Sequence, residues 1–188
     1  MSFIETAKNK KAIILLLIVI LLLTIILLYK LWPKHEDITD NSPPLFTSNE
    51  EIINISLYFG SEDDDEFVIE SREIYKTKIL INQAKQSILK LMEGPKTDKA
   101  TKIIPDGTKL RELYLEEGRA YVDFSKEISE NHPGGSKAET ATINSIVNTL
   151  IRNFSEIKEV QILIEGKIEN TLAGHIDIRQ PFKAKGAE

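Results

Sequence analysis

The longest apolar run in the chain lies near its beginning, where no charged residue occurs between Ala12 and Tyr29. Continued to Trp32, the run has 21 residues and is interrupted only by Lys30. At about 1.5 Å per residue, an α-helix of this length spans roughly 31 Å, close to the ~30 Å hydrocarbon core of a bilayer. Tyr29 and Trp32 are amphipathic side chains typical of the membrane boundary. The pattern predicts a transmembrane helix over residues 12–32.

A cleaved signal peptide is the main alternative for this segment. Its apolar region usually has about 7–15 residues and precedes a site with small side chains. The run here is longer and no such site follows Trp32, so we expect a retained signal anchor. Lys8, Lys10 and Lys11 precede the run, and the positive-inside bias places residues 1–11 in the cytoplasm. The remainder of this single-pass cell membrane protein would then be extracytoplasmic.

Residues 33–50 are polar and contain three prolines, which is typical of an extracytoplasmic linker. The periodicity changes near Glu51, where a domain over 51–182 begins; residues 183–188 form a C-terminal tail. Apolar and polar residues alternate in several segments and predict strands. These segments read "EIINISLYFG", "FVIESREIY", the hairpin "KLRELYLEEGRAYVDF" with its turn at Gly118, and "VQILI".

Two segments have the spacing of three and four residues that predicts a helix buried on one face. The first has its apolar positions at Ile81, Ala84, Ile88 and Leu91, and ends at Gly94. The second has a core stripe formed by Ile143, Ile146, Val147, Leu150 and Phe154. The elements therefore follow the order β-β-α-β-β-α-β.

The second helix is preceded by "HPGGSKAE", which could indicate either an active site or a helix cap. Ser136 and Glu139 have the S-x-x-E spacing of a capping box, in which each side chain bonds the other residue's backbone N–H. No Lys follows at the position that the phosphate-loop pattern requires, no strand leads directly into the segment, and Glu139 would repel a phosphate. A catalytic pair of Ser136 with His132 has no marked orienting acid or oxyanion hole. We therefore interpret Ser136 and Glu139 as a structural cap, expected to contribute about 0.5–2 kcal/mol.

Between Glu139 and Arg152 this helix carries no charged residue. Either the helix is wedged inside the domain, or one of its faces contacts another protein, since interface cores are depleted in charge. Asn144, Asn148 and Arg152 recur every four residues and therefore lie on one side of the helix. We expect this row to be at least partly exposed and regard it as the candidate partner interface.

The composition limits the possible functions. The chain has no Cys, which excludes disulfides, thiolate metal sites and a lipidated cysteine. Its formal net charge is −5, but residues 1–35 hold five Lys and one Glu. The remainder therefore holds 19 basic and 28 acidic side chains, a net charge of −9. An acidic domain is a poor match for nucleic acid, because nucleic-acid binding relies on Lys and Arg.

Two further patterns were considered as metal sites. The acidic run "SEDDDE" from Ser61 to Glu66 lacks the Gly and the later Glu of an EF-hand loop, so we interpret it as a solvated loop. His175 and Asp177 form an isolated H-x-D pair, which by itself is typical of a surface histidine. We expect no metal and no cofactor.

Several segments in a fixed order resemble the GerMN domain family of sporulation, spore germination and bacterial envelope proteins. They are "SLYFG", "LMEGPK", "IPDGTKL", "AYVDFS", "HPGGSKAETATINSIVNTL" and "LIEGKIENTLAGHIDI". The resemblance covers roughly Ile52 to Phe182. It implies an α+β fold similar to ring-building motifs, with two helices packed on a small mixed sheet. It also implies a non-enzymatic assembly factor, and no catalytic residues can be transferred from the family.

These inferences lead to a membrane-anchored extracytoplasmic interaction domain in sporulation, germination or cell-envelope complex formation. Its expected partners are envelope or sporulation proteins, including further copies of itself in a ring. The alternative is a peptidoglycan-binding or cell-wall-processing module. Acid pairs could serve a glycosidase, but the carboxylates here lie in charged runs without an apolar setting that would raise a pKa.

Overall fold

The computed structural model describes Leu22, Thr24 and residues 51–61 and 67–184. The chain divides into two units, Met1–Thr47 and Ser48–Glu188, and the elements discussed below belong to the second. Apart from Leu22 and Thr24, the predicted membrane segment and linker lie outside the described residues, as does the acidic run after Ser61. Within the described ranges, no helix has the length and hydrophobicity needed to cross a membrane.

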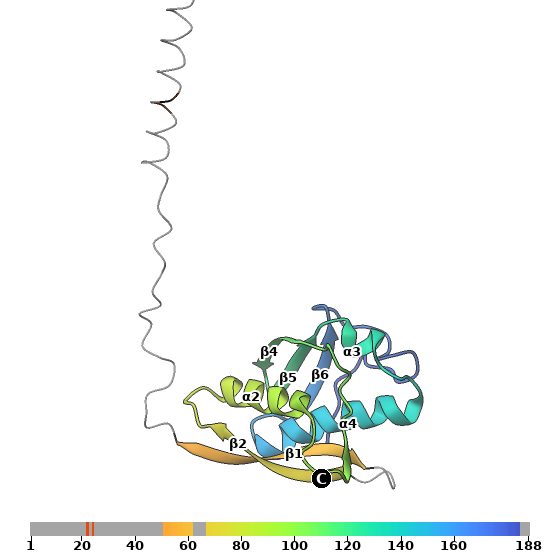
Figure 1. Cartoon of the computed structure of the whole chain (residues 1–188), viewed down its shortest axis with the longest axis horizontal. Coiled ribbons are helices and arrows are strands. Elements are labelled where there is room, and N and C mark those ends of the chain that lie inside the picture. The colour runs from red at the N-terminus through yellow and green to blue at the C-terminus, as the bar shows by residue number, and fades with distance from the viewer. Residues whose placement is uncertain (1–21, 23, 25–50, 62–66, 185–188) are drawn as a thin grey trace, which may run out of the picture. The chain divides into compact units, whose positions relative to one another are not determined.

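The first of two sheets has the strand order β2-β1-β3 (Figure 1). β1 (Ile52–Ser61) and β2 (Phe67–Tyr75) form a long antiparallel pair. β3 (Ala100–Thr101) pairs only with the last two residues of β1. The alternation predicted for β1 is confirmed, because one of its faces lies in the core through Ile55, Leu57 and Phe59.

The second sheet has the order β4-β5-β6. β4 (Leu110–Glu116) and β5 (Arg119–Phe124) form the predicted hairpin, with positive φ at Glu117 and Gly118 in its turn. β6 (Glu159–Ile164) runs parallel to β5. The expectation of one small mixed sheet is therefore corrected to two three-stranded sheets, one antiparallel and one mixed. They remain separate because a helix, rather than a strand, lies along most of the second edge of β1.

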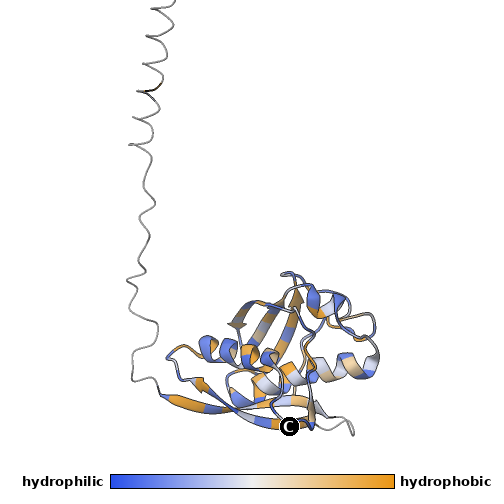
Figure 2. Cartoon of the chain, in the orientation of Figure 1, coloured by the Kyte–Doolittle hydropathy of each residue, from blue (hydrophilic) through white to orange (hydrophobic). Residues whose placement is uncertain are grey.

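Three helices complete the domain: α2 (Leu80–Glu93), α3 (Glu127–Glu130) and α4 (Ser136–Asn153). The two longer ones match the predicted helices, and the apolar stripe of α4 is buried in the core that both sheets share. α4 contacts β1 on one side and β6 on another. Figure 2 shows that α4 is nevertheless rich in pale and blue residues beside the largely orange β5 and β6.

The polar side chains of α4 explain this composition, because three of them bond the backbone of β1. Asn153 accepts from the N–H of Ser56 at 2.8 Å and donates to its C=O at 2.7 Å. Thr149 Oγ1 accepts from the N–H of Tyr58 at 3.3 Å, and Ser145 Oγ donates to the C=O of the same residue. α4 thus supplies the hydrogen bonds that another strand would have supplied to this edge. The stretch of α4 between Glu139 and Arg152, which carries no charge, is therefore wedged inside the domain.

A buried ion pair fixes the turn after α2. Glu70 and Arg72 are 6% and 8% exposed and pair with each other on the inner face of β2. Burial raises the pKa of Glu70, but hydrogen bonds to its carboxylate lower the pKa by more than burial raises it, to about 2. The donors are the Thr97 side chain, the backbone N–H groups of Lys96 and Thr97, and Arg72. Arg72 also donates to the C=O of Gly94 at 3.4 Å. The pair therefore holds β2 to the end of α2.

Candidate functional site

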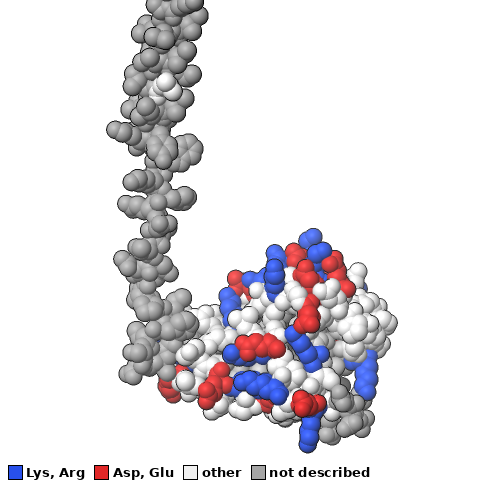
Figure 3. Space-filling view, in the orientation of Figure 1, with Lys and Arg blue, Asp and Glu red and all other residues white. Residues whose placement is uncertain are grey.

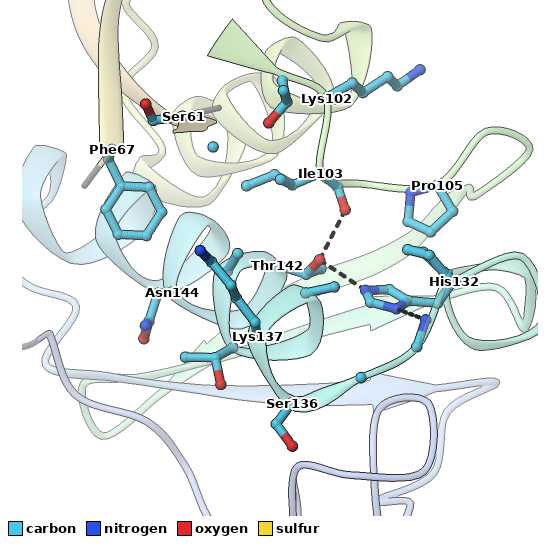
Figure 4. Close-up of a pocket in the computed structure, with 18 residues that line it drawn as sticks. Ser61, Phe67, Lys102, Ile103, Pro105, His132, Ser136, Lys137, Thr142 and Asn144 are labelled. Atoms are coloured by element: carbon cyan, nitrogen blue, oxygen red, sulfur yellow. Dashed lines mark hydrogen bonds between the residues drawn. The ribbon is translucent and has the colours of Figure 1, made fainter. Parts of the chain in front are cut away.

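A hollow of about 910 Å³ opens beside the first half of α4. Its walls come from the ends of β1 and β2, the segment after β3, and the loop that leads into α4 (Figure 4). Phe67 and Ile103 supply apolar surface, and Lys137 extends into the hollow in the close-up. The described lining contains no Asp or Glu.

The loop into α4 depends on two glycines with positive φ. Gly134 has φ of 75° and Gly135 has φ of 88°, a region that other L-residues rarely adopt. Gly135 is the N-cap residue, and no side chain bonds the first turn of the helix as a cap. The capping box predicted for Ser136 and Glu139 is therefore wrong. Ser136 is already the first helical residue, so its hydroxyl is not in the cap position.

Glu139 instead joins α4 to the C-terminal part of the chain. Its side chain is fully buried, and it accepts from the backbone N–H groups of His175 and Ile176 at 2.9–3.2 Å. The Nδ1 of His175 lies 2.8 Å from Glu139 Oε1. Burial raises the pKa of Glu139, but the hydrogen bonds from Ile176, Ala173 and His175 together lower it below its ordinary value. The carboxylate thus anchors the 173–176 segment, a role that no local sequence pattern indicated.

His132 has a structural environment. Its Nε2 lies 3.0 Å from Thr142 Oγ1, and its Nδ1 accepts from the N–H of Gly134 at 3.0 Å. Thr142 in turn donates to the C=O of Ile103 at 2.8 Å. Burial lowers the pKa of His132, which favours the neutral ring. Both ring nitrogens are therefore engaged, and Ser136 points away from His132 in Figure 4.

The structure does not bring His175 and Asp177 together as a site. His175 contacts Glu139, whereas Asp177 forms a two-oxygen ion pair with Arg179. That pair and the N–H of Arg179 hold the pKa of Asp177 at about 2. Within the described ranges, no group of three or more His, Asp or Glu side chains could hold a metal ion.

The row Asn144, Asn148 and Arg152 is only partly at the surface. Asn144 is half-buried at the rim of the hollow, and Arg152 is exposed. Asn148 is 8% exposed, so the expectation of exposure is wrong for this residue. Its Oδ1 accepts from Arg152 Nε at 3.4 Å. Asn148 therefore orients Arg152 rather than presenting its own amide.

Substitutions at the start of α4 distinguish a capping role of Glu139 from its role in anchoring the 173–176 segment. We expect Glu139→Gln to lower the free energy of unfolding by about 1–3 kcal/mol. The substitution replaces one carboxylate oxygen with an NH₂ group, which cannot accept from the backbone N–H groups of His175 and Ile176. Ser136→Ala should change it by less than about 0.5 kcal/mol. Chemical denaturation of the full chain in detergent measures both, with the exposed Glu169→Gln as the matched control.

The pH dependence gives the same test a second readout. The pKa of Glu139 is lowered in the folded state, so its contribution is present above its unfolded pKa, near 4.5. The cost of Glu139→Gln should therefore shrink as the pH falls below that value. A larger cost for Ser136→Ala than for Glu139→Gln would restore the capping box.

Comparison with known proteins identifies the family. The family model Germane, described as sporulation and spore germination, matches residues 56–169. No curated protein matches the sequence. A predicted lipoprotein from Clostridium perfringens is a similar solved structure, with 27% identity, a TM-score of 0.52, and coverage of 73% of this chain and 93% of that one.

Two further solved structures come from the sporulation protein GerM of Bacillus subtilis. Its first GerMN domain has 20% identity and a TM-score of 0.58, with coverage of 71% of this chain and 98% of that one. Its tandem GerMN domains have 18% identity and a TM-score of 0.56, with coverage of 77% of this chain and 49% of the tandem. These two likenesses support the fold. Because the family model covers more than half of the chain, this protein belongs to the Germane family of sporulation and spore germination proteins, and it is a GerMN domain protein.

Proposed function

We propose that this protein is a membrane-anchored, extracytoplasmic interaction domain that helps assemble a sporulation, germination or cell-envelope complex. The observation that carries the proposal is the family match over residues 56–169, which concerns sporulation and spore germination. The apolar run over 12–32 supports the anchor, and the three Lys before it support a cytoplasmic tail at 1–11. Residues 33–50 then act as the tether, with the domain over 51–182.

A non-enzymatic role is supported by the chemistry of the hollow. The acids that are most buried in the described structure are bonded to backbone N–H groups or to a cation: Glu70, Asp123 and Glu139. None of them lines the hollow, and the ring nitrogens of His132 are occupied. These contacts support a domain that acts by binding and without a cofactor.

We further propose that the row formed by Asn144, Asn148 and Arg152 on α4 contacts envelope or sporulation proteins. Arg152 is exposed there, and a guanidinium is suited to bidentate bonding of a partner carboxylate. Asn148 restricts its position, and Asn144 lies one turn beyond Asn148 on the same side. Basic and acidic side chains mingle over the face shown in Figure 3, which favours a protein partner over nucleic acid.

Protease accessibility tests the anchor and its orientation. A protease added to protoplasts should remove the domain and leave residues 1–11 protected. A domain that resists the protease in intact protoplasts but is cleaved after lysis would contradict the orientation. A soluble mature form without residues 12–32 would contradict the retained anchor.

A charge reversal tests the proposed contact. We expect Arg152→Glu to reduce co-purification with envelope proteins from cross-linked membranes by at least about tenfold, which corresponds to roughly 1.4 kcal/mol. Its melting temperature should fall only slightly, because the side chain is exposed and its bond to Asn148 is long. Lys99→Glu, another exposed charge reversal, is the control. Equal co-purification of Arg152→Glu and Lys99→Glu would exclude Arg152 from the contact.

A further inference from the structure

The two edges of the first sheet differ in whether their outward backbone groups are hydrogen-bonded. Along β1, the groups of Ser56 and Tyr58 that point away from β2 bond to α4, and Gly60 pairs with β3. That edge is therefore closed along most of its length. β2 is the other edge, and no strand of the described structure pairs with its outer side.

The backbone groups on that outer side can be identified from the register. The N–H of Lys76 bonds the C=O of Glu51, so even-numbered residues of β2 point their backbone groups toward β1. Odd-numbered residues point outward. At Tyr75 both outward groups are bonded by the side-chain amide of Gln86, at 2.9 and 3.0 Å.

The side-chain amide of Gln86 thus closes the outer edge of β2 at Tyr75. The part of that edge before Tyr75 is open. Ile69, Ser71 and Glu73 present outward N–H and C=O groups. Within the described residues, the one hydrogen bond to these groups is a long one, 3.5 Å from Arg72 Nη1 to the C=O of Ser71. β2 has no Pro, no Lys and no bulge, and its inward-pointing charges, Glu70 and Arg72, which are another device for blocking an edge strand, already pair with each other.

We propose that this open edge pairs with β2 of a second copy of the chain, in an antiparallel arrangement with its two-fold axis at Ser71. Only pairings that place odd-numbered residues opposite one another let the outward groups bond. The register centred on Ser71 places Ser71 opposite Ser71 and Ile69 opposite Glu73 of the second copy.

Charge selects this register among the neighbouring ones. Centring on Ser71 places Glu70 opposite Arg72 of the second copy on the inner face. Centring one residue earlier would place Glu70 opposite Glu70, and one residue later Arg72 opposite Arg72. Directly opposed like charges destabilise a strand pair, whereas opposite charges stabilise it.

The remaining side chains also match across this axis. Val68 would lie opposite Ile74 on the inner face, and the paired stretch ends before Tyr75, whose outward groups Gln86 already bonds. Ile69 is 58% exposed and would gain contact with the aliphatic stem of Glu73. A short strand pair is weak in dilute solution, so the inference rests on the proposed function, in which the anchor confines both copies to one membrane and raises their effective concentration.

Cysteine cross-linking tests both the contact and its register, because the chain has no Cys of its own. In an antiparallel hydrogen-bonded pair the two Cα atoms lie about 5.5 Å apart, within the range a disulfide spans. Full-length Ser71→Cys in membranes should therefore form a covalent dimer under mild oxidation. Glu73→Cys is the control, since its two copies would lie at least roughly 13 Å apart along the strands.

The outcomes separate this inference from the proposed function. We expect Ser71→Cys to yield at least about tenfold more dimer than Glu73→Cys. Adding Ser71→Pro to an otherwise unchanged chain should remove the self-association measured by fluorescence transfer between labelled copies, because Pro lacks the outward N–H. Equal cross-linking at both positions, or none at Ser71→Cys, would overturn the two-fold strand pair. Neither result would alter protease topology or the effect of Arg152→Glu, which test the proposed function.

Discussion

A strand edge that is buried against a helix must still find partners for its backbone groups, and this constraint shapes the GerMN domain described here. β1 meets that constraint through Ser145, Thr149 and Asn153 of α4, which bond the N–H and C=O groups of Ser56 and Tyr58. Because the same helix packs its apolar stripe on the second sheet, one helix joins two sheets that share no strand.

Side chains in the first half of α4 also bond backbone groups of other segments. Thr142 bonds the C=O of Ile103, and Glu139 bonds the N–H groups of residues 175 and 176. The helix therefore holds the segment after β3 and the C-terminal segment in place. The loop at Gly134 and Gly135 is left at the surface, beside the hollow. This arrangement is suited to a rigid binding domain that presents two surfaces to partners. They are the exposed side of α4 around Arg152 and the outer edge of β2.

The sequence predicted the strands, the two long helices and the apolar stripe of α4, because each has a regular period in its apolar residues. The family resemblance also predicted the α+β class. Periodicity could not predict where polar residues lie, since Ser, Thr and Asn side chains satisfy a buried backbone as readily as they face water. Asn148 and Asn153 illustrate the difficulty. The sequence predicts a local cap for Glu139, because the backbone N–H groups that donate to its carboxylate lie 36 and 37 residues away, where no local pattern can indicate them.

Hydrogen exchange of the Ser56 and Tyr58 amides tests most directly whether α4 closes the edge of β1. In the full chain in detergent, both amides should exchange nearly as slowly as those of Ile55 and Leu57, which belong to the ladder with β2. Asn153→Ala should accelerate exchange at Ser56 more than at Leu57. Exchange at Ser56 and Tyr58 that is orders of magnitude faster than at Ile55 and Leu57 would contradict the account, because the edge would then be open to water.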